Sequence, residues 1–191
     1  MTLSQIATIN AGYPFRGAIA EKATSAILAV QMRDTSESGG IHWHTCTATT
    51  PTGKREPQWL QEGDILIAAR GNRYYAVLVK DIPPNTVALA APQFYVVRTL
   101  AKALLPEFLM WQLNQPPCQR YLDKNSEGTS SKSIRASVLA DLPIIVPSLE
   151  KQRTILALNA LILKERKAAQ ALIHNGEQML ASIANDLFTQ A

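Results

Sequence analysis

The chain has 191 residues, of which 47% are hydrophobic and 18% charged, so its composition is that of a folded globular protein and excludes a disordered one. A formal net charge of +4 permits a polyanionic partner without requiring one. Only Cys46 and Cys118 are cysteines, which excludes a disulfide framework and fits a reducing compartment. No apolar run reaches the roughly 18 residues of a membrane span, and the first residues lack a secretory pattern. We therefore expect a cytoplasmic protein without a membrane partner.

The first half of the chain predicts a twisted, mostly β core. Leu3, Ile6 and Ala7 recur at helical spacing and indicate a short opening helix that ends before Gly12. Short strand-like runs follow, separated by loops rich in turn-forming residues. The predicted strands are 26–32, 41–47, 64–69, 74–79 and 94–98.

Short helices are predicted after this core. Pro106 is placed as the first residue of one helix, and Pro116-Pro117 as the start of another. A further helical turn is expected around Ile134 to Leu139, and 142–146 reads as a buried strand closed by Pro147. The fold class predicted is therefore α+β, a β-rich domain with short helices.

From Leu149 the pattern changes to one long helix of about 40 residues, which at 1.5 Å per residue is about 60 Å. Its apolar residues recur at threes, fours and sevens, as a packing seam requires, although Glu165 and Gly176 interrupt the seam. Basic residues are concentrated near its start and acidic Glu177 and Asp186 near its end, so an antiparallel copy would set opposite charges together. A helix that folds back on its own domain is the alternative. The seam residues are Ile155, Leu158, Ile162, Ala169, Leu172, Met179, Ile183 and Leu187.

Several short motifs, in their order along nearly the whole chain, resemble the specificity subunits of type I restriction-modification enzymes. The motifs are Leu3-Ser4-Gln5-Ile6-Ala7, Gly63-Asp64-Ile65-Leu66-Ile67, Gln93-Phe94, Pro106-Glu107-Phe108-Leu109, Gly128-Thr129, Leu142-Pro143-Ile144 and Leu149-Glu150-Lys151-Gln152. The resemblance implies a target recognition domain over 1–148 and, over 149–191, a helix for dimerisation, spacing and methyltransferase docking.

What the resemblance implies about function is non-catalytic DNA reading. Such subunits catalyse no reaction and bind no cofactor. Each recognition domain reads half of a bipartite double-stranded DNA site, and methyltransferase subunits bind the assembly. Family members typically carry two recognition domains and two helices, while this sequence resembles one of each. It is expected to act as a half-subunit whose homodimer reads an interrupted palindrome, because two-fold protein symmetry matches two-fold related half-sites.

Two segments are candidates for contacting DNA. The first follows a predicted strand and contains Arg70, Gly71, Asn72, Arg73 and Tyr74. Arginine pairs with guanine edges, asparagine with adenine edges, glycine permits close backbone approach, and tyrosine offers a hydroxyl or a stacking face. An inert surface turn of the same composition is the alternative reading.

The second segment runs from Lys124 to Lys132 and includes Ser130 and Ser131, whose hydroxyls and lysines suit phosphate oxygens. A simple connector is its alternative. Lys54 and Arg55 could add contacts to the DNA backbone.

Other functional classes fit less well. His42, His44 and Cys46 alternate on a predicted strand and could approach a metal, but no second cluster completes a tetrahedral site, so no metal site is predicted. No glycine-rich cofactor turn, serine-hydrolase elbow or carboxylate group for a nuclease metal is found, so no enzyme and no catalytic residue are predicted. The competing hypothesis is a protein-interaction module with a helical dimerisation arm that does not read DNA.

Overall fold

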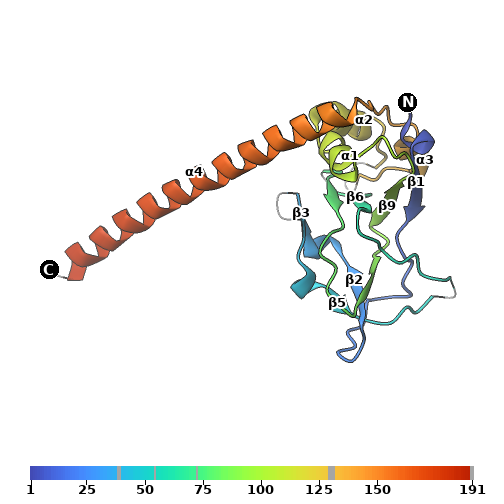
Figure 1. The fold of residues 1–191 in the computed structure, drawn as a ribbon. Helices are drawn as coiled ribbons and strands as arrows, with labels where there is room; N and C mark the ends of the chain where they lie inside the picture. The colour runs from blue at the N-terminus through green and yellow to red at the C-terminus, as the bar shows by residue number, and fades with distance from the viewer. Residues whose placement is uncertain (38–39, 54, 72, 129–131, 190–191) are drawn as a thin grey trace. The chain divides into compact units, whose positions relative to one another are not determined.

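The computed structural model describes residues 1–37, 40–53, 55–71, 73–128 and 132–189. The chain divides into two units, Met1–Leu149 and Glu150–Ala191. The first is a β-rich domain with short helices, and the second is a single long helix (Figure 1). The predicted α+β class with a long C-terminal helix is therefore confirmed.

The larger sheet of the first unit has the strand order β1-β9-β6-β7, with every neighbouring pair antiparallel. All side chains of β6 are buried, as its unbroken apolar run predicts for a strand covered on both faces. This strand places the segment that follows it at the edge of a rigid core. The strands are β1 Ala7–Ala11, β6 Ile65–Ala68, β7 Ala76–Leu78 and β9 Phe94–Thr99.

A smaller sheet has the order β5-β2-β8, and a two-stranded ribbon joins β3 to β4. Strand β2 is parallel to β8 and antiparallel to β5. Where these sheets meet, the chain passes so close that a Cβ on Gly12 would lie 2.0 Å from the carbonyl oxygen of Ala91, so only glycine fits there. The strands are β2 Ile27–Val30, β3 Thr35–Ser36, β4 Gly40–Ile41, β5 Thr47–Ala48 and β8 Val87–Ala90.

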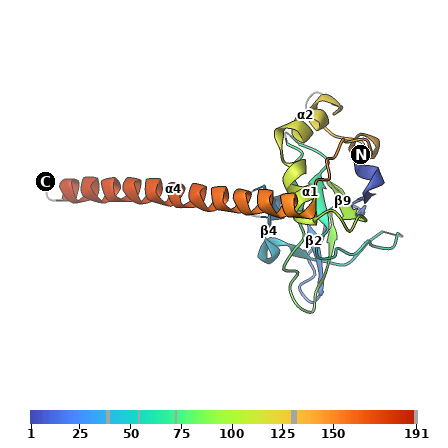
Figure 2. The same cartoon turned by 45° about the horizontal axis from the view of Figure 1, so that its top comes forward.

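Three short helices complete this unit: α1 Pro106–Leu113, α2 Pro116–Lys124 and α3 Ala136–Ala140. The prolines begin α1 and α2 as predicted, since the first turn needs no N–H from them. Helix α1 packs against β7 and α2 packs against α1. Both helices lie at one end of the domain and β2 at the other (Figures 1 and 2).

Two predicted elements were wrong and one strand was missed. The opening helix is only a 3-10 turn, Leu3–Gln5, after which the chain pairs with β9 as strand β1. The segment 142–146 is not a strand: Pro143 forms one bridge, to Thr2, and prolines cannot donate to a ladder. Strand β8 was not predicted, because two of its four residues are alanines, which carry little strand signal.

The predicted strand 41–47 is also wrong, because a 3-10 turn, Trp43–Thr45, interrupts it. The indole N–H of Trp43 donates to the carbonyl of Lys80 at 2.9 Å, and the ring packs beside the core. This tertiary contact overrides the local alternation of the segment, so His42, His44 and Cys46 do not alternate along one strand.

The second unit contains the helix α4, Leu149–Thr189, of 41 residues. Over the residues described here, 150–189, the unit holds no other element that could cover the apolar side chains of the helix. Most of the predicted seam is exposed, including Leu158, Ile162, Leu172, Met179, Ile183 and Leu187. Within the described residues, no helix has the length and apolarity needed to cross a membrane.

Candidate nucleic-acid interface

The two segments predicted separately as DNA contacts are joined by backbone hydrogen bonds. The N–H of Gly71 donates to the carbonyl of Lys132 at 3.1 Å, and Arg70 forms an antiparallel bridge with Ser133. The N–H of Ile134 donates to the carbonyl of Ala69 at 3.0 Å. The structure therefore brings the end of β6 and the segment around Lys132 together, although 60 residues of sequence separate them.

The cations of these segments point into solvent while their backbones are fixed. Arg70, Arg73 and Lys132 are exposed. Gly71 has a φ of +115°, and a Cβ added at this position would meet no atom within 4 Å. The surface of another molecule could therefore approach the backbone of Gly71 closely. Lys124 is exposed at the end of α2.

Helices α1 and α2 hold the neighbouring part of this loop through side chains. The side-chain amide of Asn114 accepts a hydrogen bond from the N–H of Ala76 and donates one to the carbonyl of Ala76, both at 2.8 Å. Asn114 therefore binds both backbone groups of the first residue of β7. Gln119 donates to the carbonyl of Tyr74 at 3.0 Å. These contacts give the loop a defined conformation.

Tyr74 belongs to the core in this structure. Its side chain is among the largest fully buried ones, with a relative exposure of 2%, so its ring does not offer a stacking face to the surface. Its hydroxyl has no hydrogen-bond partner among the described residues. The adjacent Tyr75 hydroxyl is hydrogen-bonded to Thr35 Oγ1 at 2.8 Å.

Each of three exposed cations near this surface has a carboxylate partner. Arg73 Nη1 lies 2.7 Å from Glu37 Oε2, and Lys132 Nζ lies 2.6 Å from Asp123 Oδ1. Hydrogen bonding to Asp123 raises the pKa of Lys132 above its usual range, so this lysine is a cation at neutral pH. The third pair, Arg135 with Glu127, has its closest atoms 2.7 Å apart.

A cleft of about 380 Å³ lies between the first two ion pairs. Glu37, Arg73, Arg120 and Asp123 are among the residues that line it. Sequence reasoning missed Glu37, Arg120 and Asp123. The polar face of the predicted helix from Pro116 could have indicated the last two, whereas Glu37 lies in a loop whose sequence carries no such signal.

The other predicted contacts are not brought to this cleft or lie outside the described residues. Arg55 lines a different, small cavity beside Gly12 and Tyr13. Lys54, Asn72, Ser130 and Ser131 fall outside the part of the chain that the structure describes.

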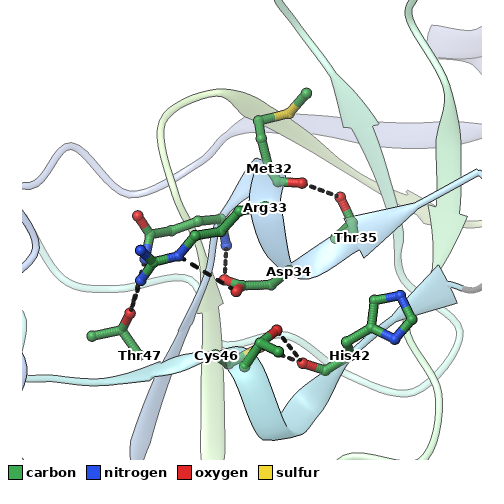
Figure 3. Close-up of polar contacts among 9 residues, drawn as sticks. Met32, Arg33, Asp34, Thr35, His42, Cys46 and Thr47 are labelled. Carbon is green, nitrogen blue, oxygen red and sulfur yellow. Dashed lines mark hydrogen bonds and ion pairs between the residues drawn. The ribbon is translucent and has the colours of Figure 1, made fainter.

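Residues Met32 to Thr35, which lead to Glu37, are held by polar contacts within the core (Figure 3). Asp34 is fully buried, and its Oδ2 accepts from the N–H of Gln31 at 2.9 Å. Thr35 Oγ1 donates to the carbonyl of Met32 at 3.1 Å. The next strand is held here too, since the N–H of His42 donates to the carbonyl of Asp34 at 2.8 Å.

Cys46 and the histidines beside it form a structural turn. The thiol of Cys46 donates to the carbonyl of His42 at 3.6 Å. Burial, followed by the charge of Asp34, raises the pKa of Cys46 to about 12, which disfavours the thiolate that a metal would need. Among the described residues, no three His, Cys, Asp or Glu side chains are grouped to hold a metal ion.

The comparisons with known proteins identify the family. The sequence matches the family model of the type I restriction modification DNA specificity domain over residues 1–165. The chain therefore belongs to this family. No curated protein matches the sequence.

Solved structures show the same fold at low sequence identity. The type I restriction-modification S subunit from M. genitalium is 13% identical with a TM-score of 0.56, over 84% of this chain and 37% of that one. The HsdS subunit from Thermoanaerobacter tengcongensis is 19% identical with a TM-score of 0.58, over 88% and 37%. A chain from a type I R-M system, solved for its complex assembly and conformational transition, is 18% identical with a TM-score of 0.65, over 90% and 40%. This chain thus corresponds to about two fifths of each.

Proposed function

We propose that this chain is a non-catalytic DNA-reading subunit of a type I restriction-modification complex, and that the unit Met1–Leu149 contacts one half of a bipartite site. One observation supports this most strongly. The two segments that carry suitable side chains are hydrogen-bonded to each other through Gly71 and Lys132, so their cations can act on one duplex. Membership of the specificity-domain family supports the same role.

In this proposal the residues divide between bases and phosphates. Arg70 and Arg73 present planar guanidinium groups that can pair bidentately with guanine, and Gly71 permits close approach of the backbone. Lys124 and Lys132 bind phosphate oxygens as point charges. By their residue type, Asn72 joins the base readers, while Ser130, Ser131, Lys54 and Arg55 join the phosphate contacts.

Tyr74 acts in the proposal as a support for the loop and not as a base contact. Its ring is buried, so it fixes the chain between the two arginines and strand β7. A buried anchor beside exposed readers keeps the readers in a defined geometry, which specific recognition needs.

Helix α4 is proposed to pair antiparallel with the same helix of a second copy and to provide the docking surface for methyltransferase subunits. The exposed apolar seam supports this, since a helix with such a stripe needs a partner to cover it. The charge distribution supports the antiparallel direction, because Lys151 and Arg153 lie near one end and Glu177 and Asp186 toward the other. A homodimer of this kind would read an interrupted palindrome.

Selection from a random duplex library tests the proposal. The purified chain, together with its methyltransferase subunit, is mixed with the library, and the bound pool is sequenced. Enrichment of an interrupted palindrome is expected. Enrichment of one half-site would retain DNA reading but remove the homodimer, while a stable complex that enriches no sequence would favour the interaction module.

A further inference from the structure

Arg73 and Glu37 form a contact that uses only one part of the guanidinium group. The bond runs from Nη1 of Arg73 to Oε2 of Glu37 at 2.7 Å, and the side chain of Arg73 is 76% exposed. A guanidinium group has five N–H donors in a rigid plane, so a carboxylate on Nη1 leaves the edge formed by Nε and Nη2 available. That edge is sufficient for two parallel hydrogen bonds to one guanine.

Glu37 is itself held in place relative to this loop. Thr35, two residues before Glu37, is hydrogen-bonded at 2.8 Å to the hydroxyl of Tyr75, two residues after Arg73. Both hydroxyls also contact Met32, because Thr35 Oγ1 donates to its carbonyl at 3.1 Å and the Tyr75 hydroxyl lies 3.9 Å from its sulfur. The link joins the strand before Glu37 to the strand after Arg73.

The base of this link is buried in the core. Asp34 is fully buried, and strand β3 begins at the next residue (Figure 3). The position of the backbone that leads to Glu37 therefore depends on the folded core.

We propose that Glu37 is a specificity-determining positioning residue: it holds the guanidinium group of Arg73 in one orientation, so that its free edge reads a guanine. This inference rests on the proposed DNA-reading function and names one device within it. Without Glu37 the flexible arginine would turn to the nearest phosphate, which every sequence offers. The carboxylate therefore favours the base contact at the expense of sequence-independent contacts.

The pair Lys132 and Asp123 provides a matched control, because Asp123 lines the same cleft as Glu37. A lysine ammonium is a point charge whose phosphate contact carries no directional requirement. Asp123 therefore only competes with phosphate for Lys132, and its removal strengthens binding to all sequences equally. The two carboxylates should thus differ in their effect on sequence preference, although both neutralise one exposed cation at a similar distance, 2.7 Å and 2.6 Å.

The experiment repeats the library selection with wild type, Glu37→Gln, Asp123→Asn and Arg73→Ala, each as the full chain with its methyltransferase subunit. Glu37→Gln should lower the preference at one base position by about fivefold, at the same position that Arg73→Ala relaxes, and raise affinity for random duplex. Asp123→Asn should raise affinity for all sequences by up to about fivefold with the preference unchanged. The thermal midpoint of Glu37→Gln should stay within about 2 °C of wild type, because the pair is exposed.

Three results would overturn the proposal. Glu37→Gln could leave the preference unchanged while Arg73→Ala relaxes it, which would make the ion pair incidental. It could alter a base position different from that of Arg73, which would make Glu37 a reader of its own base. If wild type enriches no sequence at all, the DNA-reading function fails first and the inference fails with it.

Discussion

Arg98 binds the buried carboxylate of Asp64 through two nitrogens, with Nε 2.6 Å from Oδ1 and Nη2 2.7 Å from Oδ2. Asp64 is 1% exposed and also accepts a hydrogen bond from the N–H of Gln61 at 2.8 Å. It immediately precedes strand β6, so this contact joins β6 to β9 and supports the position of the loop that carries Arg70 and Arg73.

Replacing Asp64 with Asn should lower the free energy of unfolding by about 2 kcal/mol, because it removes the charge that binds Arg98 through two nitrogens, while the side chain of Arg98 is still 31% exposed. Urea denaturation of the full chain measures the change. The exposed Asp123→Asn is the control and should change stability by less than about 0.5 kcal/mol. An equal effect of both substitutions would contradict the structural role of the buried pair.

Replacing Arg73 with Ala should reduce discrimination at one base position by about 1–3 kcal/mol, since it removes a bidentate contact. Competition binding between the selected site and single-base variants of it measures the effect. Arg55→Ala is the control: Arg55 lines a different cavity and is proposed as a phosphate contact, so its removal should weaken binding to all sequences alike and leave the preference unchanged. An unchanged sequence preference would remove Arg73 from the readers.

Replacing Lys132 with Ala should weaken binding to all duplexes alike and reduce the slope of log affinity against log salt by about one unit. Titrations at several salt concentrations, with the selected site and a scrambled duplex, provide both quantities. A change in preference at constant slope would show that Lys132 contacts a base.

Replacing Tyr74 with Phe should leave the unfolding free energy unchanged or raise it by up to about 1 kcal/mol. The hydroxyl is buried without a partner among the described residues, so its removal loses no described hydrogen bond. Thermal unfolding and DNA binding are measured together. A loss of affinity at unchanged stability would mean that the hydroxyl acts on DNA.

Replacing Leu172 with Asp should convert a dimer to a monomer if α4 pairs through its seam, because the substitution places a charge in an apolar interface. Sedimentation equilibrium at micromolar concentrations measures the mass. Gln170→Glu, which adds the same charge on the opposite side of the same helix, is the control. A wild-type chain that is already monomeric would contradict the homodimer.

The prediction from sequence succeeded where one local pattern decides the structure. The apolar run at Ile65 to Ala68 became a strand, and the prolines at Pro106 and Pro116 began helices. The long helix from Leu149 followed from its periodicity. The prediction failed at 41–47, where the contact of Trp43 with Lys80 stabilises a turn that the local alternation of residues does not encode.

For the candidate site, Arg73 and Lys132 were predicted from residue type together with the family resemblance, and their contact with DNA stays a prediction. The sequence could not identify Glu37 or Asp123 as their partners, because an ion pair depends on the distance between atoms and not on spacing along the chain. Nor could it indicate that Tyr74 is buried, since an aromatic residue next to an arginine is equally compatible with a core or a surface.

The sequence by itself thus determined the strands with continuous apolar runs, the proline-started helices and the long helix, because these depend on periodicity and on backbone restrictions within a few residues. Only the tertiary structure decided that Gly71 and Lys132 share a hydrogen bond. It also decided that Thr35 and Tyr75 link the segments that carry Glu37 and Arg73. Such contacts join residues far apart in the chain, and they form only when the whole core has packed.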